Sequence, residues 1–200
     1  MLVIGITGGV GAGKSEVLGL LCRKSKCFVL KADEVAKELE EPGRPCYRPL
    51  IDLLGDKILD DSGRIVPKLM SAAIFESGDE AVLKKVNSIV HPAVKREILC
   101  LIDDKREAGE YDFFFLEAAL LIEDGYETIC DELWYVYAGK RVRRKRLMLS
   151  RGYSKEKIDS IFASQLDERT FRRHCKRVID NNGDIAETSN IIDEILELYK

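Results

Sequence analysis

The chain has 200 residues, 46% of them hydrophobic and 34% charged, with a formal net charge of −3. This length and apolar content predict one domain with a sizeable buried core. The acidic balance argues against general affinity for nucleic acid, and no apolar run approaches the roughly 20 residues of a membrane span. The N-terminal segment does not read as a signal peptide. We therefore expect a cytoplasmic protein without a membrane or nucleic-acid partner.

The six cysteines lie far apart and form no C-x-x-C pair. This spacing argues against a zinc site and favours reduced thiols, as in a cytosol. The chain has only two histidines, so a histidine-based metal site is also disfavoured. The sequence leaves the oligomeric state open.

The first apolar run, residues 2–6, predicts a buried strand, and residues 8–15 then fit the phosphate-binding pattern G-x-x-x-x-G-K-[ST]. An apolar-periodic helix start follows. Glycines let the loop N–H groups surround a phosphate, and the helix N-terminus adds positive charge. We expect Lys14 to reach the β- and γ-phosphates and the Ser15 hydroxyl to bind Mg²⁺. The alternative, a glycine-rich turn with a chance Lys-Ser pair, is disfavoured by the strand–loop–helix order.

Four further apolar runs predict strands at residues 27–30, 113–116, 133–137 and 178–179. They are short and mostly continuous, as expected of parallel strands covered on both faces. Helical patterns separate them, which predicts a three-layer α/β/α fold with a parallel five-stranded sheet. This P-loop NTPase class includes the nucleoside-monophosphate kinases. Ligands bind at the carboxyl ends of such strands, so Asp33, Glu117 and the phosphate loop should converge.

The long segments between strands suit a small-molecule kinase, which needs a lobe for its acceptor and a mobile lid over the transferring phosphoryl group. Residues 34–109 are too many for one crossover helix, and the helical pattern there breaks near His91-Pro92. We expect this segment to be a helical acceptor-binding lobe. Residues 140–175 begin with a very basic run and suit a mobile lid over the phosphates. The core then comprises residues 1–33, 110–139 and 176–200 and ends in an amphipathic helix.

In combination, these motifs resemble the dephospho-coenzyme A kinase family over nearly the whole chain. The phosphate loop alone is shared by many families. More specific are the ordered A-D-x-x-A at residues 32–36, H-P at 91–92 and V-I-D-N-x-G at 178–183. Further similarity covers residues 54–55, 61–63, 117–121, 146–148, 151–154 and 165. The resemblance implies transfer of the γ-phosphoryl group of ATP to the ribose 3′-hydroxyl of 3′-dephospho-CoA, giving CoA and ADP in the last step of CoA synthesis.

The resemblance also implies which residues form the site. Implied catalytic residues are Lys14, Asp33 and Arg146. Implied nucleotide-binding residues are Gly9, Gly11, Ala12, Gly13, Lys14, Ser15, Glu16, Arg146 and Asn181. Mg²⁺ would be held by Ser15 and Glu117, and the acceptor would be bound by Thr7, Asp33, His91 and Glu117. The implied cofactors are ATP and Mg²⁺.

Several of these residues have a purely structural alternative. Asp33 could be a helix N-cap instead of the group that accepts or orients the acceptor proton. Glu117 could likewise cap a helix, and His91 could be a satisfied structural residue. The basic run at residues 140–146 could be a solvated helix face. Within that run we expect Arg146 to matter most, and replacement of Arg143 to be mild if Arg143 faces solvent.

The sequence departs from the family pattern at a few positions. Glu16 stands where a Thr is common and adds a negative charge near the phosphates. Ser150 stands where a second lid arginine is frequent, and Pro67 stands where an arginine follows a turn. The neighbouring Arg151 and Lys68 are candidates to replace these cations. Cys175-Lys176 replaces Ala-Asp, which we expect to be neutral.

Two other functions remain open from the residues alone. One is a kinase for another small acceptor, such as a nucleoside or a sugar. The other is a phosphate-loop regulatory protein that hydrolyses ATP slowly and acts through a partner. A GTPase is disfavoured, because the guanine-reading N-K-x-D motif is absent.

Overall fold

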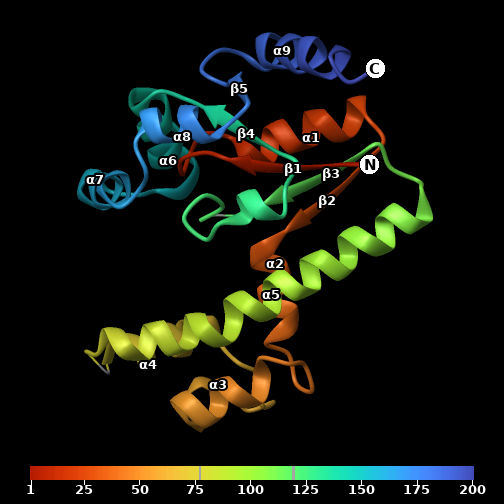
Figure 1. Cartoon of the computed structure of the whole chain (residues 1–200). Coiled ribbons are helices and arrows are strands. Elements are labelled where there is room, and N and C mark those ends of the chain that lie inside the picture. Colours follow the sequence, from red (N-terminus) through yellow and green to blue (C-terminus); the bar gives the residue numbers. More distant parts are fainter. Residues whose placement is uncertain (77, 119) are drawn as a thin grey trace. The chain divides into compact units, whose positions relative to one another are not determined.

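Figure 1 shows the computed structural model, which describes residues 1–76, 78–118 and 120–200. The chain forms two compact units. The first comprises Met1–Lys31 and Lys105–Lys200 and contains the sheet, and the second comprises Ala32–Asp104 and is helical. The expected lobe ran from residue 34 to 109. Among the described residues, no helix combines the length and the apolar character needed to span a membrane.

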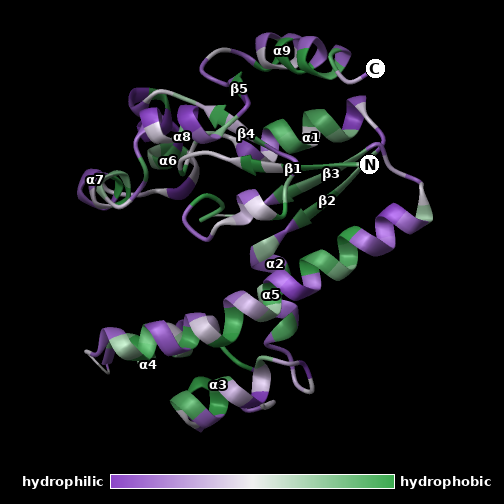
Figure 2. Cartoon of the chain, viewed as in Figure 1, coloured by the Kyte–Doolittle hydropathy of each residue, from purple (hydrophilic) through white to green (hydrophobic). Residues whose placement is uncertain are grey.

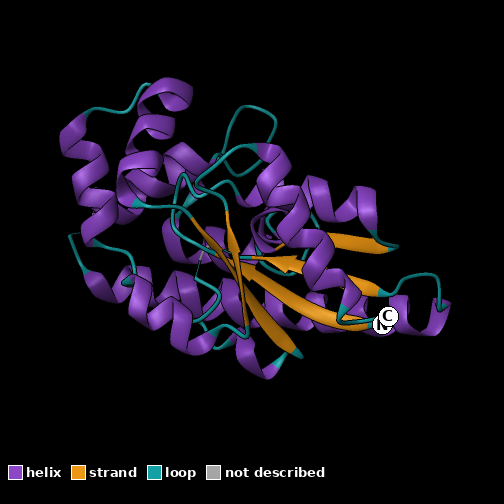
Figure 3. Ribbon diagram, turned by 90° about the horizontal axis from the view of Figure 1, so that it is seen from above, coloured by secondary structure: helices purple, strands orange, loops and turns teal. Residues whose placement is uncertain are grey.

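The first unit is built on five parallel strands, β1 (Leu2–Thr7), β2 (Cys27–Lys31), β3 (Phe113–Glu117), β4 (Glu132–Tyr137) and β5 (Arg177–Asp180). Their order in the sheet is β2-β3-β1-β4-β5. Figure 3 shows the strands side by side and twisted, with helices around them. The predicted parallel five-stranded sheet is confirmed, and each strand extends slightly beyond its apolar run.

Five helices and a short 3₁₀ turn complete this unit. They are α1 (Lys14–Lys24), η2 (Tyr126–Thr128), α6 (Lys140–Arg151), α7 (Lys155–Ala163), α8 (Glu168–His174) and α9 (Ile185–Glu197). Polar side chains cap three of the helix starts, because the first N–H groups of a helix have no partner within it. Ser154 caps α7, Asp167 caps α8, and Asp184 forms a capping box with Glu187 at the start of α9.

The main core lies between the sheet and the helices α1 and α9. Figure 2 shows the apolar strands in green and the mixed surfaces of these helices. Fully buried members of the core are Ile4, Ile6, Val17, Leu21, Phe115, Trp134, Val136, Ile179 and Ile192. On the opposite face of β4, the ring of Tyr135 stacks on Phe171 of α8 with 4.8 Å between centroids. Helices therefore cover both faces of the sheet, as the continuous apolar strands predicted.

The second unit contains α2 (Ala32–Leu39), α3 (Tyr47–Leu54), η1 (Asp56–Ile58), α4 (Pro67–Glu76) and most of α5 (Glu80–Ala108). The expected break near His91-Pro92 was wrong, since α5 continues through Pro92. A proline inside a helix removes one hydrogen bond. Here an apolar stripe of buried residues, with Val86 before the proline and Val94 and Ile98 after it, holds both halves in place.

A buried carboxylate sits at the amino end of β4 and joins three elements. Glu132 accepts hydrogen bonds from Trp134 Nε1 at 3.1 Å, Lys176 Nζ at 2.5 Å and the Tyr199 hydroxyl. Its side chain is 7% exposed. Burial alone would raise the pKa of the Glu132 carboxyl, but the hydrogen bonds from Lys176, Tyr199 and Trp134 hold that pKa below its usual value.

We predict that Glu132→Ala lowers the free energy of unfolding by roughly 1–3 kcal/mol, because the buried Trp134 N–H loses its acceptor. Urea denaturation measures this change. The depressed pKa contributes stability above the unfolded value of about 4.3, and that contribution is lost as the pH falls through the lower folded value. The variant should lack this acid-dependent loss. The control Glu197→Ala removes only a surface contact with Lys200. Equal stability of the two variants would contradict the prediction.

Candidate functional site

The loop between β1 and α1 has the shape of a phosphate-binding loop. Its turn is closed by a hydrogen bond from Ala12 N to Gly9 O at 3.0 Å. Gly13 precedes α1 with φ 91°, a left-handed conformation that favours glycine. No side chain caps α1. The first N–H groups of this helix are therefore available to an anion, and the helix dipole favours one.

Lys14 and Ser15 lie in the first turn of α1, directly behind the loop. The Lys14 ammonium donates to the carbonyl oxygen of Gly8 at 2.9 Å, so it lies near the beginning of the loop. Ser15 is exposed. Both groups occupy the positions from which the motif addresses phosphates and a metal ion.

Asn181 follows β5 and holds the far end of the loop. Its Nδ2 donates to Ala12 O at 2.8 Å and approaches the Glu16 carboxylate at 3.4 Å. Its Oδ1 accepts from the Thr188 hydroxyl of α9 at 2.9 Å. Asn181 and Thr188 are 1% and 0% exposed. This buried amide thus fixes a loop carbonyl, and a Cβ on Gly13 would lie only 2.2 Å from its nitrogen. Its predicted nucleotide contact stays a prediction.

Helix α6 sends two arginines to the loop, at different ends. Arg146 Nη1 donates to Ala12 O at 3.2 Å. Arg143 Nε donates to Val10 O at 2.9 Å, and its Nη2 donates to the side-chain oxygen of Gln165. A Cβ on Gly9 would lie 2.3 Å from the Arg143 guanidinium, so only glycine allows this approach.

Arg143 therefore does not face solvent. The expectation that replacing Arg143 has a mild effect assumed an exposed side chain, so it does not apply. Its guanidinium lies over the ring of Phe162, 4.4 Å from the centroid. Burial lowers the pKa of Arg143, and among the described residues no carboxylate pairs with it. Arg144 instead pairs with Asp159 at 2.5 Å. The basic run is thus divided between loop contacts, a surface ion pair and solvent.

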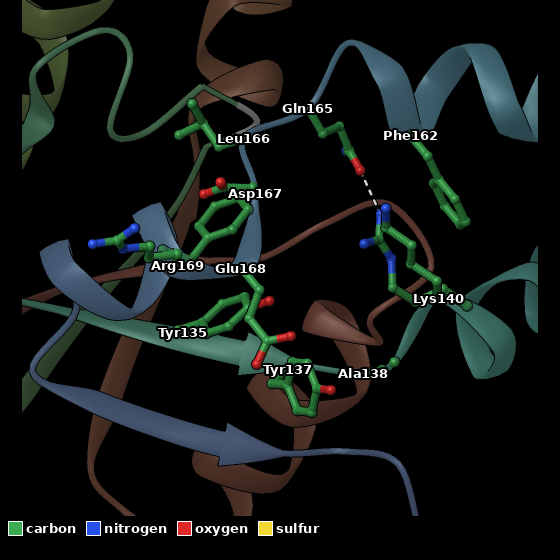
Figure 4. Close-up of a pocket in the computed structure, with 13 residues that line it drawn as sticks. Tyr135, Tyr137, Ala138, Lys140, Phe162, Gln165, Leu166, Asp167, Glu168 and Arg169 are labelled. Atoms are coloured by element: carbon green, nitrogen blue, oxygen red, sulfur yellow. Dashed lines mark hydrogen bonds between the residues drawn. The ribbon is translucent and has the colours of Figure 1, made fainter.

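A cavity of about 390 Å³ lies beside this loop contact, between β4 and the helices α6–α8. Figure 4 shows Tyr135 and Tyr137 of β4, with Phe162 and Gln165 from the lid segment. The lining residues are Tyr135, Tyr137, Ala138, Gly139, Lys140, Arg143, Phe162, Gln165, Leu166, Asp167, Glu168, Arg169 and Phe171. The cavity gives the Arg143 and Gln165 side chains room beside the loop.

Two of the predicted acceptor residues lie at the carboxyl edge of the sheet with the loop. Thr7 is the last residue of β1 and is buried. Glu117 is the last residue of β3 and is in register with Ile6 of β1. Within the described part of the chain no hydrogen bond or ion pair engages its carboxylate, and no described helix begins directly after it. The adjoining similarity at residues 117–121 includes Ala119, which lies outside the described residues.

Asp33 and His91 belong to the second unit. Asp33 is the second residue of α2 and is exposed, so it lies inside the first turn and is not the N-cap. His91 is half-buried in α5, immediately before Pro92. Their approach to the phosphate loop stays a prediction. Of the cations considered as replacements, Arg151 ends α6 near the Tyr153 ring and Lys68 is exposed on α4.

Sequence reasoning missed the contacts of three residues in this arrangement, of which Gln165 was noted only for its similarity to the family and Arg143 only as part of the basic run. Arg143 and Gln165 contact the loop, and Thr188 holds Asn181. The sequence did carry one signal, because Arg143 precedes Arg146 by about one helical turn and the two can share a helix face. No local pattern pairs Gln165 with Val10, since 155 positions separate them.

A family model and several curated relatives point to one family, and solved structures share the fold. A family model described as dephospho-CoA kinase matches residues 2–187. A dephospho-CoA kinase of Moorella thermoacetica is 34% identical over 188 residues, which cover 94% of this chain and 87% of the relative. A crystal structure from Thermus thermophilus has a TM-score of 0.81 at 28% identity, covering 100% and 98% of the two chains. Dephospho-CoA kinase from Campylobacter jejuni shares the fold, with a TM-score of 0.72 at 18% identity and coverage of 98% and 95%.

We predict that Thr188→Val weakens ATP binding and lowers the free energy of unfolding by roughly 1–3 kcal/mol, because the buried Asn181 oxygen loses its donor. The freed amide no longer fixes the loop carbonyl of Ala12. Calorimetric ATP titration and urea denaturation measure the two effects. In the control Thr128→Val, a surface hydroxyl loses only its bond to Gly125 O. If both variants bind ATP equally well, Asn181 does not shape the loop.

Proposed function

The chain belongs to the dephospho-CoA kinase family, and from this premise we propose how its residues divide the work of the reaction. The enzyme is an ATP-dependent kinase that phosphorylates dephospho-CoA in the last step of CoA biosynthesis. The observation that carries the proposal is the uncapped N-terminus of α1 behind a glycine loop. Such a loop binds the phosphates of ATP, which is a substrate here.

The loop and its lysine hold the nucleotide. N–H groups of the loop and of the first turn of α1 bind the phosphates, and Lys14 leaves the Gly8 carbonyl to reach the β- and γ-phosphates. Arg146 reaches the loop from α6 and meets the charge that develops on the transferring group. Glu16 and Asn181 support the loop beside Ala12.

Mg²⁺ would be held by Ser15 and Glu117. Hydroxyl and carboxylate oxygens are ligands that Mg²⁺ prefers, together with substrate phosphates and water. The exposure of Ser15 and the unengaged carboxylate of Glu117 at the neighbouring strand end support this assignment. When bound, the ion would supply positive charge that neutralises the phosphate oxygens.

Asp33 accepts or orients the proton of the acceptor hydroxyl, here the ribose 3′-hydroxyl of dephospho-CoA. A carboxylate in this role must be free of strong protein partners and accessible. Asp33 is exposed in the first turn of α2, two residues after β2 ends, and no described residue engages its side chain. Thr7, His91 and Glu117 complete the proposed acceptor site.

The proposal includes a cytoplasmic location and partners limited to the two small substrates. The support is the widely spaced cysteines, which suit a reducing compartment, and the acidic composition.

A panel of acceptors in a coupled ADP-release assay tests this function. We expect dephospho-CoA to stimulate ADP release. Among the ribose-bearing acceptors, we expect only dephospho-CoA to be phosphorylated efficiently. A nucleoside or sugar that serves equally well would support a different acceptor. Acceptor-independent ATP hydrolysis at the same rate would support a regulatory protein instead.

We predict that Asp33→Asn lowers kcat by roughly 10²- to 10⁴-fold, because the amide cannot accept the hydroxyl proton. ATP affinity should change little, since the nucleotide contacts come from the loop. Steady-state kinetics and ATP titration separate the two effects. Glu38→Gln removes one negative charge from an exposed position of the same helix and is the matched control. A loss of thermal stability without a loss of turnover would show that Asp33 acts only on the helix.

A further inference from the structure

At the phosphate loop, the side-chain oxygen of Gln165 lies between a backbone N–H donor and an arginine donor. The side-chain oxygen of Gln165 accepts from Val10 N at 3.3 Å and also from Arg143 Nη2. The dashed line at Gln165 in Figure 4 marks the second bond. Arg143 in turn donates through Nε to Val10 O at 2.9 Å. A loop peptide and an arginine thus converge on one neutral oxygen.

This pair of donors is what a phosphate oxygen requires. Loop N–H groups bind phosphate oxygens, and arginine presents fixed, forked donors that match them. An amide oxygen carries only a partial negative charge, so it is the weaker partner of both. The Gln165 oxygen therefore stands in for a phosphate oxygen.

The position along the loop indicates which phosphate. Lys14, whose role is with the β- and γ-phosphates, has its ammonium at Gly8 O. Arg143 lies over the adjacent Gly9 and Val10. Arg146 instead lies at Ala12, near the start of α1. Lys14 and Arg143 are therefore at the same end of the loop, and Arg146 is at the other.

The charge of Arg143 also lacks compensation. Its guanidinium is half-buried against Phe162, and within the described residues it forms no ion pair. Burial of this guanidinium disfavours the charged form and lowers the pKa of Arg143. An anion bound at Val10 N would offset the free-energy penalty of burying the Arg143 charge. Arg143 would therefore be attracted toward that anion.

We propose that Arg143 is a further catalytic residue, which contacts the transferring phosphoryl group, and that Gln165 is a stand-in ligand which holds Arg143 and Val10 N–H ready until a phosphate oxygen displaces it. The displaced amide can move into the adjoining cavity, whose lining includes Gln165. The proposal deepens the proposed function, because it assigns a second lid arginine to the same reaction.

The first test compares arginines on α6. Arg143→Ala should lower kcat by roughly 10²- to 10³-fold, the usual cost of one transition-state donor. Arg141→Ala, an exposed arginine of the same helix, is the control and should leave kcat within about twofold. Arg143→Lys keeps the positive charge but removes the forked guanidinium donors. This variant still tests the catalytic role if the alanine variant fails to fold. It should also lose most of kcat at an unchanged melting temperature. Equal kcat for Arg143→Lys, Arg141→Ala and the unaltered enzyme would overturn the catalytic role.

The second test uses inorganic tripolyphosphate as the probe, titrated calorimetrically without acceptor. Gln165→Ala removes the oxygen that the anion must displace, so the Kd should fall several-fold. Gln165→Glu places a charged oxygen there, strengthens its bond to Arg143 and should raise the Kd about tenfold or more. A merely structural glutamine would shift both variants in the same direction, which would overturn the stand-in role.

These titrations distinguish the proposal from the proposed function. They involve no acceptor, so they remain decisive even if another acceptor replaces dephospho-CoA. Conversely, efficient phosphorylation of dephospho-CoA by Arg143→Lys would leave the proposed function intact and contradict only the role of Arg143.

Discussion

A phosphate can be held by backbone N–H groups only if the protein leaves those groups without internal partners and still keeps the loop in one shape. The structure meets the second demand by fixing the loop through its carbonyls, and the first only in part, because Ala12 N donates to Gly9 O and Val10 N donates to the Gln165 oxygen. Asn181 and Arg146 hold Ala12 O, Arg143 holds Val10 O, and Lys14 holds Gly8 O. The N–H groups at the start of α1 remain uncapped. The carbonyl partners come from the residue that follows β5 and from α6 and α1.

The parallel sheet explains why these partners can meet. All five strands end at the same edge, so the segments that follow β1, β3, β4 and β5 emerge beside one another. The first of these segments becomes the loop, and the last carries Asn181. Helix α6 starts directly after β4, which brings Arg143 and Arg146 to the loop within two turns. The strands are mostly apolar, with polar residues at their ends, because helices cover both faces of the sheet.

The lid carries its charges in two distinct ways. Arg144 pairs with Asp159, so its charge stabilises the contact between α6 and α7. Arg143 and Arg146 instead rest on neutral carbonyl oxygens. A cation that is bound only to neutral acceptors retains much of its attraction for an anion. The difference follows from where each arginine lies on α6. It separates Arg144, which is in an ion pair, from Arg143 and Arg146, which can bind an anionic ligand.

The sequence alone determined the sheet, the phosphate loop and the family, because each depends on local pattern. Continuous apolar runs specify buried strands, and residues 8–15 carry the loop geometry in their glycines and Lys14. A local rule also misled, since Pro92 predicted a break that the packed stripe of α5 overrides. Only the tertiary structure decided which cations reach the loop and what holds Asn181. The contacts of Arg143 with Val10 and of Asn181 with Ala12 join residues more than 130 positions apart. They depend on how the helices pack on the sheet, which neighbouring residues do not encode.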